Sequence, residues 1–269
     1  MPHPLLKDFV ATIMVIDALV SDEQATAVSP YPPTPQQSLF FYLEDTIQMK
    51  KDGNEKFETQ PRGVIVGPQL TRVNLIMGKH HKAVRVGFHP GGLFRLLGIP
   101  MHELLDEGYD AAVFFGAKMR EIHQQLADTP DPTSIIKIVE SFLIRETKKL
   151  KALHPFDLVM KDLVLKEGLI SVEQLASDSC LSLRQFERVC KSRLGLRPKL
   201  FSRIIRFSKA YRLSEAQKNI NWTSIAYECG YYDQMHMIRD FREFAGVSPG
   251  IIEKELSATP FRLQKDLRL

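Results

Sequence analysis

The chain has 269 residues, of which 44% are hydrophobic, so it is long enough for two domains with separate cores. No run of about 18 apolar residues is present and no signal-peptide pattern opens the chain, which excludes a membrane-spanning helix and predicts a cytoplasmic protein. The net charge of +4 is uneven, because residues 155–269 hold 19 basic and 14 acidic residues while residues 1–154 hold 17 and 18.

Residues 1 to about 115 contain short β-branched and aromatic runs that are separated by Gly, Pro and Asn. These runs predict strands of a small antiparallel sheet at Ser38–Leu43, Gly63–Val66, Val73–Met77 and Ala83–Phe88. The proline-rich segment Ser29–Pro35 cannot pair within a central strand, so we expect an extended stretch on the surface.

Helices are predicted after the last of these strands. A Pro-Gly-Gly turn at residues 90–92 leads into a short helix at Leu93–Leu97. Apolar residues at helical intervals predict further helices at Ala117–Ala127 and Thr133–Leu150. Two roles remain open for the last of these: it either pairs with its copy in a dimer or covers the β domain. Ala152–Pro155 is the predicted hinge, which makes residues 1–154 the N-terminal domain.

The C-terminal domain, residues 155–269, contains one motif twice. The first copy runs from Ser171 to Pro198 and the second from Asn221 to Pro249, with equivalent residues offset by 50 or 51 positions. The one extra residue falls in a break, where a turn absorbs it without rotating the apolar face of a helix. The repeat predicts two helix-turn-helix units, at about 171–193 and about 221–244.

Each predicted helix of these units has a capping residue at its start. The four caps are Ser171, Ser182, Asn221 and Asp233. Gly230 marks the turn of the second unit, and Cys180 occupies the matching position in the first. Because that position favours glycine, Cys180 is expected to adapt its backbone to it.

A linking helix is predicted at about 199–218, after Pro198 at a helix start. Twenty residues at about 1.5 Å each span roughly 30 Å. This is close to the ~34 Å of one duplex turn, the separation that two major-groove readers on one DNA face require. The segment from Arg184 to Arg212 adds ten Lys or Arg and one acid, Glu187, which fits contact with phosphates.

The second helix of each unit is expected to enter the major groove and to present its exposed face to base edges. The predicted base contacts are Arg184, Glu187, Arg188, Gln234, Met235, Ile238 and Arg239. The predicted phosphate contacts are Ser182, Arg193, Lys199 and Arg203. Arg188 and Arg239 hold equivalent places and each suits guanine. Glu187 either accepts from a cytosine amino group or pairs with Arg184. The second unit is expected to discriminate less, because two of its contacts can only touch thymine methyl groups.

Residues 165–256 resemble the DNA-binding domain of the AraC/XylS family of bacterial transcriptional regulators. The motifs that carry the resemblance are Ser182 to Arg188, Gly195–Pro198, Ile225–Tyr231 and Phe241–Pro249. Cys190 and Met237 depart from it, since the family usually has aromatic residues there. The resemblance implies a sequence-specific regulator that binds double-stranded promoter DNA, with RNA polymerase as a further candidate partner.

Residues Val86–Pro100, with Glu103–Asp106 after them, resemble the sensor half of a subset of these regulators. This second resemblance implies an α+β protein with a small N-terminal β-barrel or double-sheet domain of cupin-like shape and flanking helices. Such a domain binds a small effector or mediates contacts in a homodimer. The effector, the promoter, the direction of regulation and the oligomeric state are left open.

No catalytic constellation, metal site or cofactor is expected. His80 and His81 are adjacent and would point to opposite faces of a strand, so both cannot easily bind one ion with His89. The three cysteines have no zinc spacing. The alternatives are a cupin-type metalloenzyme, which stoichiometric metal would indicate, or a DNA-repair protein fused to the same DNA-binding module. The repair alternative needs a reactive cysteine in a motif of its own, and none precedes Cys180. A protein-interaction module leaves the basic segment unexplained.

Overall fold

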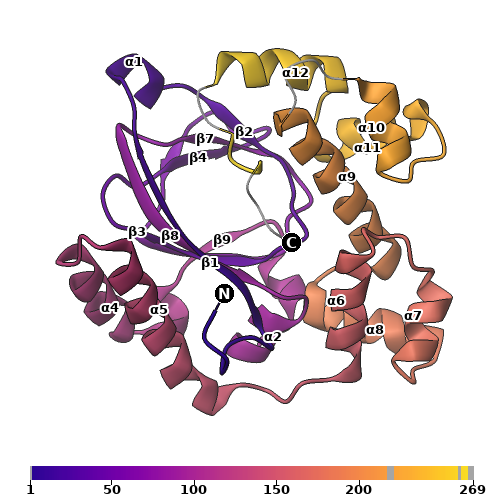
Figure 1. Ribbon diagram of the computed structural model, residues 1–269, viewed down its shortest axis with the longest axis horizontal. Coiled ribbons are helices and arrows are strands. Elements are labelled where there is room, and N and C mark those ends of the chain that lie inside the picture. Colours follow the sequence, from indigo (N-terminus) through magenta and orange to yellow (C-terminus); the bar gives the residue numbers. More distant parts are fainter. Residues whose placement is uncertain (1, 217–220, 260–261, 266–269) are drawn as a thin grey trace.

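The computed structural model describes residues 2–216, 221–259 and 262–265 (Figure 1). Two antiparallel sheets form the core of the N-terminal part and helices form the C-terminal part, which confirms the predicted α+β fold. The two sheets lie face to face and remain open, so the N-terminal part is a double-sheet structure and not a closed barrel.

The larger sheet has the strand order β1-β8-β3-β6-β9. Its strands are β1 (Val10–Leu19), β8 (His80–Phe88), β3 (Ser38–Tyr42), β6 (Gly63–Val66) and β9 (Gly108–Asp110). Side chains alternate between its faces. In β8, Val84 and Val86 pack beneath helices, whereas Ala83 and Arg85 face the smaller sheet. The sequence predicted β3, β6 and β8 but neither β1 nor β9.

The smaller sheet has the strand order β2-β7-β4-β5. Its strands are β2 (Ser29–Tyr31), β7 (Val73–Ile76), β4 (Gln48–Lys51) and β5 (Glu58–Thr59). The proline-containing strand β2 lies at the edge, where a missing donor is tolerated.

The expectation that the proline-rich segment lies on the surface is wrong. Ser29, Pro32 and Pro33 are buried because the C-terminal end of the chain covers them. The hydroxyl groups of Ser29 and Thr259 lie 2.6 Å apart, and Gln264 Nε2 donates to the Pro32 carbonyl over 2.7 Å.

Helices flank the sheets of the N-terminal part. They are α1 (Asp22–Ala25), α2 (Gly92–Leu97), α3 (Ala112–Phe115), α4 (Lys118–Ala127) and α5 (Pro132–Glu146), with 3₁₀ turns η1 (Met101–Leu104) and η2 (Thr147–Lys149). Helices α4 and α5 lie beside the larger sheet (Figure 1). Ile135, Val139 and Phe142 of α5 are fully buried against it. The apolar face of α5 therefore covers the β domain of its own chain, which is one of the two roles that the sequence left open for this helix.

The C-terminal part consists of helices joined by short turns. They are α6 (Pro155–Leu165), α7 (Val172–Asp178), α8 (Leu183–Leu194), α9 (Pro198–Ala216), α10 (Trp222–Glu228), α11 (Gln234–Phe244) and α12 (Pro249–Ala258). Both helix-turn-helix units and the linking helix α9 lie where the sequence predicts them, although positions 217 and 218 of the predicted helix fall outside the described residues. Helix α6, which begins at the end of the predicted hinge, was not expected.

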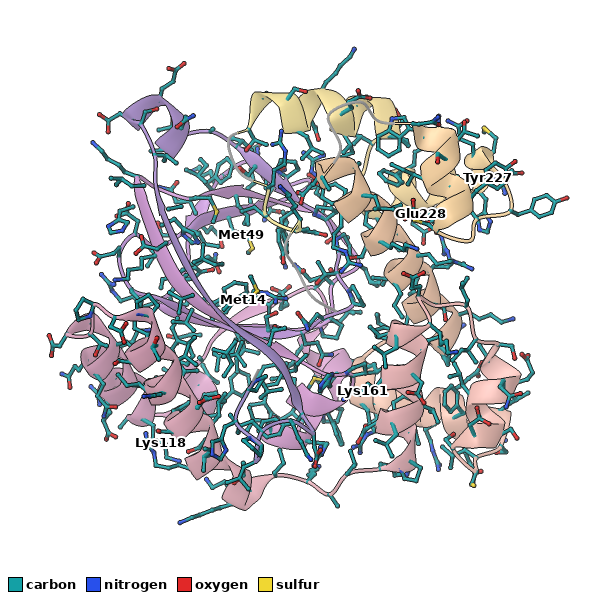
Figure 2. All side chains as sticks on the ribbon, in the orientation of Figure 1. Met14, Met49, Lys118, Lys161, Tyr227 and Glu228 are labelled. Carbon is teal, nitrogen blue, oxygen red and sulfur yellow. The ribbon has the colours of Figure 1, made fainter. Side chains whose placement is uncertain are left out.

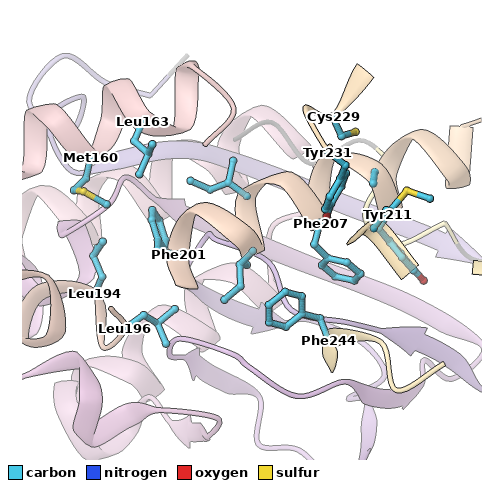
Figure 3. Close-up of a cluster of buried hydrophobic side chains, with 14 of the residues drawn as sticks. Met160, Leu163, Leu194, Leu196, Phe201, Phe207, Tyr211, Cys229, Tyr231 and Phe244 are labelled. Atoms are coloured by element: carbon cyan, nitrogen blue, oxygen red, sulfur yellow. The ribbon is translucent and has the colours of Figure 1, made fainter. Parts of the chain in front are cut away.

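One apolar core extends through the C-terminal helices (Figure 3). Phe207 of α9 lies near its middle, with its ring centroid 5.0 Å from that of Phe241 and 5.3 Å from that of Phe244. Cys190 and Met237, which stand where the family has aromatic residues, are both fully buried. The linking helix is therefore built into the core that supports both units.

Candidate nucleic-acid interface

The exposed helix of each unit begins at a capped residue. Ser182 Oγ accepts from the Gln185 amide over 3.3 Å, and Gln185 Oε1 accepts from the Ser182 amide over 3.0 Å. Asp233 Oδ1 accepts from the His236 amide over 2.7 Å. Ser171 and Asn221 cap α7 and α10 in the same way, so all four predicted helix starts are confirmed. The caps fix where α8 and α11 begin, and hence which residues their exposed faces carry.

One residue in the turn of the first unit, Cys180, has a left-handed backbone conformation. Cys180 has φ 55°, close to the φ of 70° at the equivalent Gly230. This confirms that Cys180 takes up a conformation that glycine adopts more readily.

Cys180→Gly is expected to raise the free energy of unfolding by about 0.5–1 kcal/mol. The left-handed conformation costs a residue with a Cβ about 1–2 kcal/mol, and the extra freedom of glycine in the unfolded chain offsets part of that gain. Urea denaturation of the full chain measures the change. Cys180→Ala is the matched control, because it removes the thiol and keeps the Cβ. An equal gain from both variants would show that the thiol, and not the backbone, is responsible.

Helix α8 has one buried and one exposed face. Phe186 and Cys190 are fully buried. The predicted base-contacting residues Arg184, Glu187 and Arg188 are all exposed on the other face. The structure therefore brings together the three side chains of the first unit that were expected to face DNA.

Helix α11 has the same arrangement in the second unit. Gln234, Met235 and Arg239 are exposed and Ile238 is half-buried. Gln234 Oε1 accepts from the Thr223 hydroxyl over 3.2 Å, which ties this side chain to α10. The four predicted base contacts of the second unit thus lie on one helix face, and of the four side chains Arg239 carries a charge.

Two of the four predicted phosphate contacts, Ser182 and Lys199, are exposed. The other two, Arg193 and Arg203, are buried and half-buried, and both pair with acids of the same chain. Arg193 is buried, its Nε donates to Asp157 Oδ1 over 2.7 Å and its second terminal nitrogen also pairs with Asp157. Its guanidinium lies over the ring of Phe94 at 4.6 Å. Arg193 therefore joins α8 to α6 and to the N-terminal part.

Arg203 joins the linking helix to the second unit. Its guanidinium donates to Asp240 over 2.7 Å and to Glu243 over 3.2 Å, both on α11. Hydrogen bonds to Glu243 and Asp240 raise the pKa of Arg203 above its usual value. The charge that was expected to meet a phosphate is thus compensated within the protein.

Eight of the ten cations of the basic segment either form ion pairs with acids of the chain or lie exposed on the surface, and the other two, Arg206 and Arg212, are half-buried. Arg193, Arg203 and Lys209 are paired with acids, the last with Glu167 over 2.7 Å. The exposed cations of the segment are Arg184, Arg188, Lys191, Arg197 and Lys199. Arg197 was not among the expected contacts, although it lies within the motif Gly195–Pro198 that marks the end of the first unit.

Two exposed tyrosines of the second unit were also missed. Tyr232 is 89% exposed in the turn before α11, and Tyr227 is 68% exposed and points outward from α10 (Figure 2). The signal for Tyr232 was its place directly after Tyr231, which follows Gly230 in the turn, because only one of two adjacent tyrosines can enter the core there. Both hydroxyl groups are available as donors to phosphate oxygens.

Both units are fixed to the N-terminal part. Near the end of α8, Gly195 lies against Pro68 and Met101. After the second unit, Arg72 donates to both carboxylate oxygens of Glu255 on α12, over 2.8 and 3.1 Å. A change in the N-terminal part can therefore reach both helix-turn-helix units.

The histidines that suggested a metal site do not come together. His80 Nε2 lies 2.9 Å from Asp17 Oδ1, whereas His81 is buried. Across the described ranges, no three His, Cys, Asp or Glu side chains are grouped so that they could hold a metal ion. No helix in the part of the chain that the structure describes is long and apolar enough to cross a membrane.

Two family models match parts of the chain. Residues 175–268 match a helix-turn-helix domain, and residues 1–110 match a domain of unknown function (DUF6597). No curated protein matches the sequence. The two matches fall on separate parts of the chain, the helix-turn-helix domain at the C-terminal end and the second domain at the N-terminal end.

Several solved structures are similar to all or part of the chain. A variant of apo ToxT from Vibrio cholerae strain SCE256 has a TM-score of 0.50 and 14% identity, over 91% of this chain and 98% of that one. ToxT from Vibrio cholerae O395 has a TM-score of 0.48 and 11% identity, over 94% and 100%. The DNA-binding domain of AdpA, solved with a target DNA, is 25% identical over 38% of this chain and 92% of that one, with a TM-score of 0.36. The first of these similarities shows a common two-domain fold.

Proposed function

The chain belongs to the AraC/XylS family of transcriptional regulators, and from this premise we propose that its two helix-turn-helix units read successive major grooves on one face of promoter DNA. It is a DNA-binding regulator of transcription. The observation that carries the proposal is that α8 and α11 are equivalent helices whose exposed faces both hold the expected base-contacting residues.

The linking helix supports reading of two grooves. Helix α9 has 19 residues, which corresponds to a length of about 28 Å. It is held to α11 by the ion pairs of Arg203 and to α10 by Lys209, whose Nζ donates to the Glu228 carbonyl over 2.9 Å. A rigid spacer of nearly one duplex turn suits two readers on one DNA face.

The proposal assigns base contacts to Arg184, Glu187 and Arg188 in the first unit, and to Gln234, Met235, Ile238 and Arg239 in the second. Phosphate contacts are assigned to Ser182 and Lys199, with Arg197 added. Arg193 and Arg203 are left out because acids of the same chain already compensate their charges.

The N-terminal domain, assigned to residues 1–154, is proposed to regulate this binding in the cytoplasm without catalysis of its own. It would do so through a small-molecule effector or through contact with a second copy, and RNA polymerase is the proposed partner at the promoter. The contacts of Arg72 and Gly195 with the other domain give an effector a physical route to the DNA-binding helices.

Arg188→Ala is expected to weaken binding to the specific site by about 1–3 kcal/mol and to relax the preference at one base pair. The reason is the loss of a guanidinium that donates twice to one guanine. Competition binding with a set of duplexes that differ at single positions measures both effects.

Lys137→Ala is the matched control, because Lys137 is exposed on α5 beside the β sheet. It removes the same charge and should leave DNA affinity unchanged. If Arg188→Ala instead weakens binding equally on every sequence, Arg188 contacts a phosphate and does not read a base.

A further inference from the structure

A cavity of about 230 Å³ lies between the two sheets. Met14 of β1 and Met49 of β4 point toward one another across it (Figure 2). Most of the wall is apolar, and it includes Phe40, Val64 and Leu75. A concave, largely apolar space with few polar groups is the usual form of a small-molecule site.

One charged side chain is buried in the cavity wall. Arg85 lies on the inward face of β8 and is only 2% exposed. Among the described residues, none provides a hydrogen bond to any of its three side-chain nitrogens. Its guanidinium carbon is 5.9 Å from the centre of the Phe40 ring. The guanidinium therefore faces a largely apolar space, in which the uncharged Tyr31 hydroxyl is the neighbouring polar group that acts on it.

The acids among the described wall residues do not compensate this charge. Asp106, at the cavity, accepts from the amides of Leu70 and Thr71 over 2.7 and 3.0 Å. Glu107 pairs with Lys51 over 2.6 Å. Both acids thus have partners of their own.

Two further titratable groups of the wall, Tyr31 and His81, carry no negative charge. Burial lowers the pKa of Arg85, and Tyr31 is the group that opposes this effect. Burial also raises the pKa of Tyr31, so its hydroxyl stays protonated. Burial lowers the pKa of His81 to about 4, which leaves that imidazole neutral near pH 7. An arginine cannot relieve the cost of burial by losing its proton, so the wall keeps an uncompensated positive charge.

We propose that the cavity binds a small apolar carboxylic acid as its carboxylate, with the carboxylate paired to Arg85 and the apolar body between the sheets. The proposal rests on the assignment of the N-terminal domain as an effector-binding domain. One guanidinium matches one carboxylate in charge and in geometry, since both are planar and form two parallel hydrogen bonds. A phosphate monoester would bring a second negative charge, whereas the other cations of the wall already have partners: Lys51 pairs with Glu107 over 2.6 Å, and Arg262 donates to the Thr259 carbonyl over 2.9 Å. The cavity is smaller than the roughly 300–1,000 Å³ of drug-sized sites, so the acid is compact.

The same cavity is in contact with the C-terminal end of the chain. Leu263 and Arg262 contribute to its wall. The backbone amide of the neighbouring Gln264 donates to Glu215 Oε2 on α9 over 2.9 Å. A bound acid therefore touches a segment that is hydrogen-bonded to α9, the helix that links the two DNA-binding units. Through this contact, binding of the acid in the cavity would change the affinity for DNA.

The test is isothermal titration calorimetry of the full chain, without DNA, against straight-chain acids of about four to ten carbons and arylacetic acids. The primary amide of each acid is the uncharged control. At least one acid is expected to bind, and its amide to bind roughly 10- to 150-fold more weakly, the range that hydrogen bonds to a charged group supply. Arg85→Met should reduce acid binding by a similar factor and leave amide binding unchanged. Lys137→Met, at an exposed position, should change neither.

A second measurement separates binding from folding. Without ligand, Arg85→Met is expected to melt at or above the temperature of the wild type, because an uncompensated buried charge is replaced by an apolar chain. Equal affinity of an acid and its amide would overturn the proposal, as would undiminished acid binding by the variant or no acid binding below about 1 mM. A large loss of stability in Arg85→Met would also contradict it, since Arg85 would then have a structural partner. DNA affinity is measured separately, so failure of the regulator assignment and failure of this site give different results.

Discussion

Arg193→Met is expected to lower the free energy of unfolding by about 3–5 kcal/mol. Asp157 is only 4% exposed and pairs with Arg193 through both carboxylate oxygens. Without the guanidinium, this carboxylate remains buried, with the His154 amide as its other donor, over 3.1 Å. Removing one partner of a buried pair leaves the cost of burying the other charge, and that cost produces the large effect. Urea denaturation of the full chain measures it.

The double variant Asp157→Asn with Arg193→Met is the control. It removes both charges, so it should recover at least half of the lost stability. The sequence alone predicted a phosphate contact for Arg193. That role would be supported, and the structural one contradicted, if Arg193→Met were as stable as the wild type and bound DNA with a weaker dependence on salt.

The double variant Arg188→Ala with Arg239→Ala is expected to weaken specific DNA binding by about 2–6 kcal/mol, which corresponds to roughly 30- to 20,000-fold. The two arginines lie on different helices, α8 and α11, and share no partner in the described part of the chain. Their losses should therefore add. Fluorescence anisotropy with one specific duplex, at a fixed salt concentration, measures the single and double variants.

The matched control is Lys137→Ala with Lys254→Ala, which removes two exposed cations from α5 and α12. It should bind DNA as the wild type does, apart from a small effect of net charge. If the Arg188 and Arg239 variant loses no more than Arg188→Ala alone, the second unit makes no base contact through Arg239.

Local signals in the sequence were sufficient to predict the helix-turn-helix units. Caps such as Ser182 and Asp233, and apolar residues at helical spacing, act within one or two turns of helix, so they can be read from short stretches. The exposed face of α8 follows from the buried positions of Phe186 and Cys190. For this reason the sequence was sufficient to place Arg184, Glu187 and Arg188 together on one helix face.

Contacts between distant parts of the chain were not predictable in this way. Asp157 lies 36 residues before Arg193, and Asp240 lies 37 residues after Arg203. The sequence alone does not distinguish a basic residue that contacts a phosphate from one that pairs with a buried acid of the same chain. The burial of Pro32 likewise depends on Gln264, which is 232 residues away.

Arg85 shows what sequence alone could have suggested in the N-terminal domain. It lies between Val84 and Val86 in a predicted strand, so alternation places it on the opposite face from two core residues. A single sheet would have exposed that face to water. Only the second sheet, whose strands β4 and β7 cover it, turns the position into a cavity wall.

Selection of randomised duplexes by the full chain, at about 150 mM salt, tests the central claim most directly. Sequencing of the retained DNA should show two enriched blocks with centres about 10–11 base pairs apart, because each unit reads one major groove on the same face. A single enriched block would contradict the claim and would mean that the second unit holds only the DNA backbone.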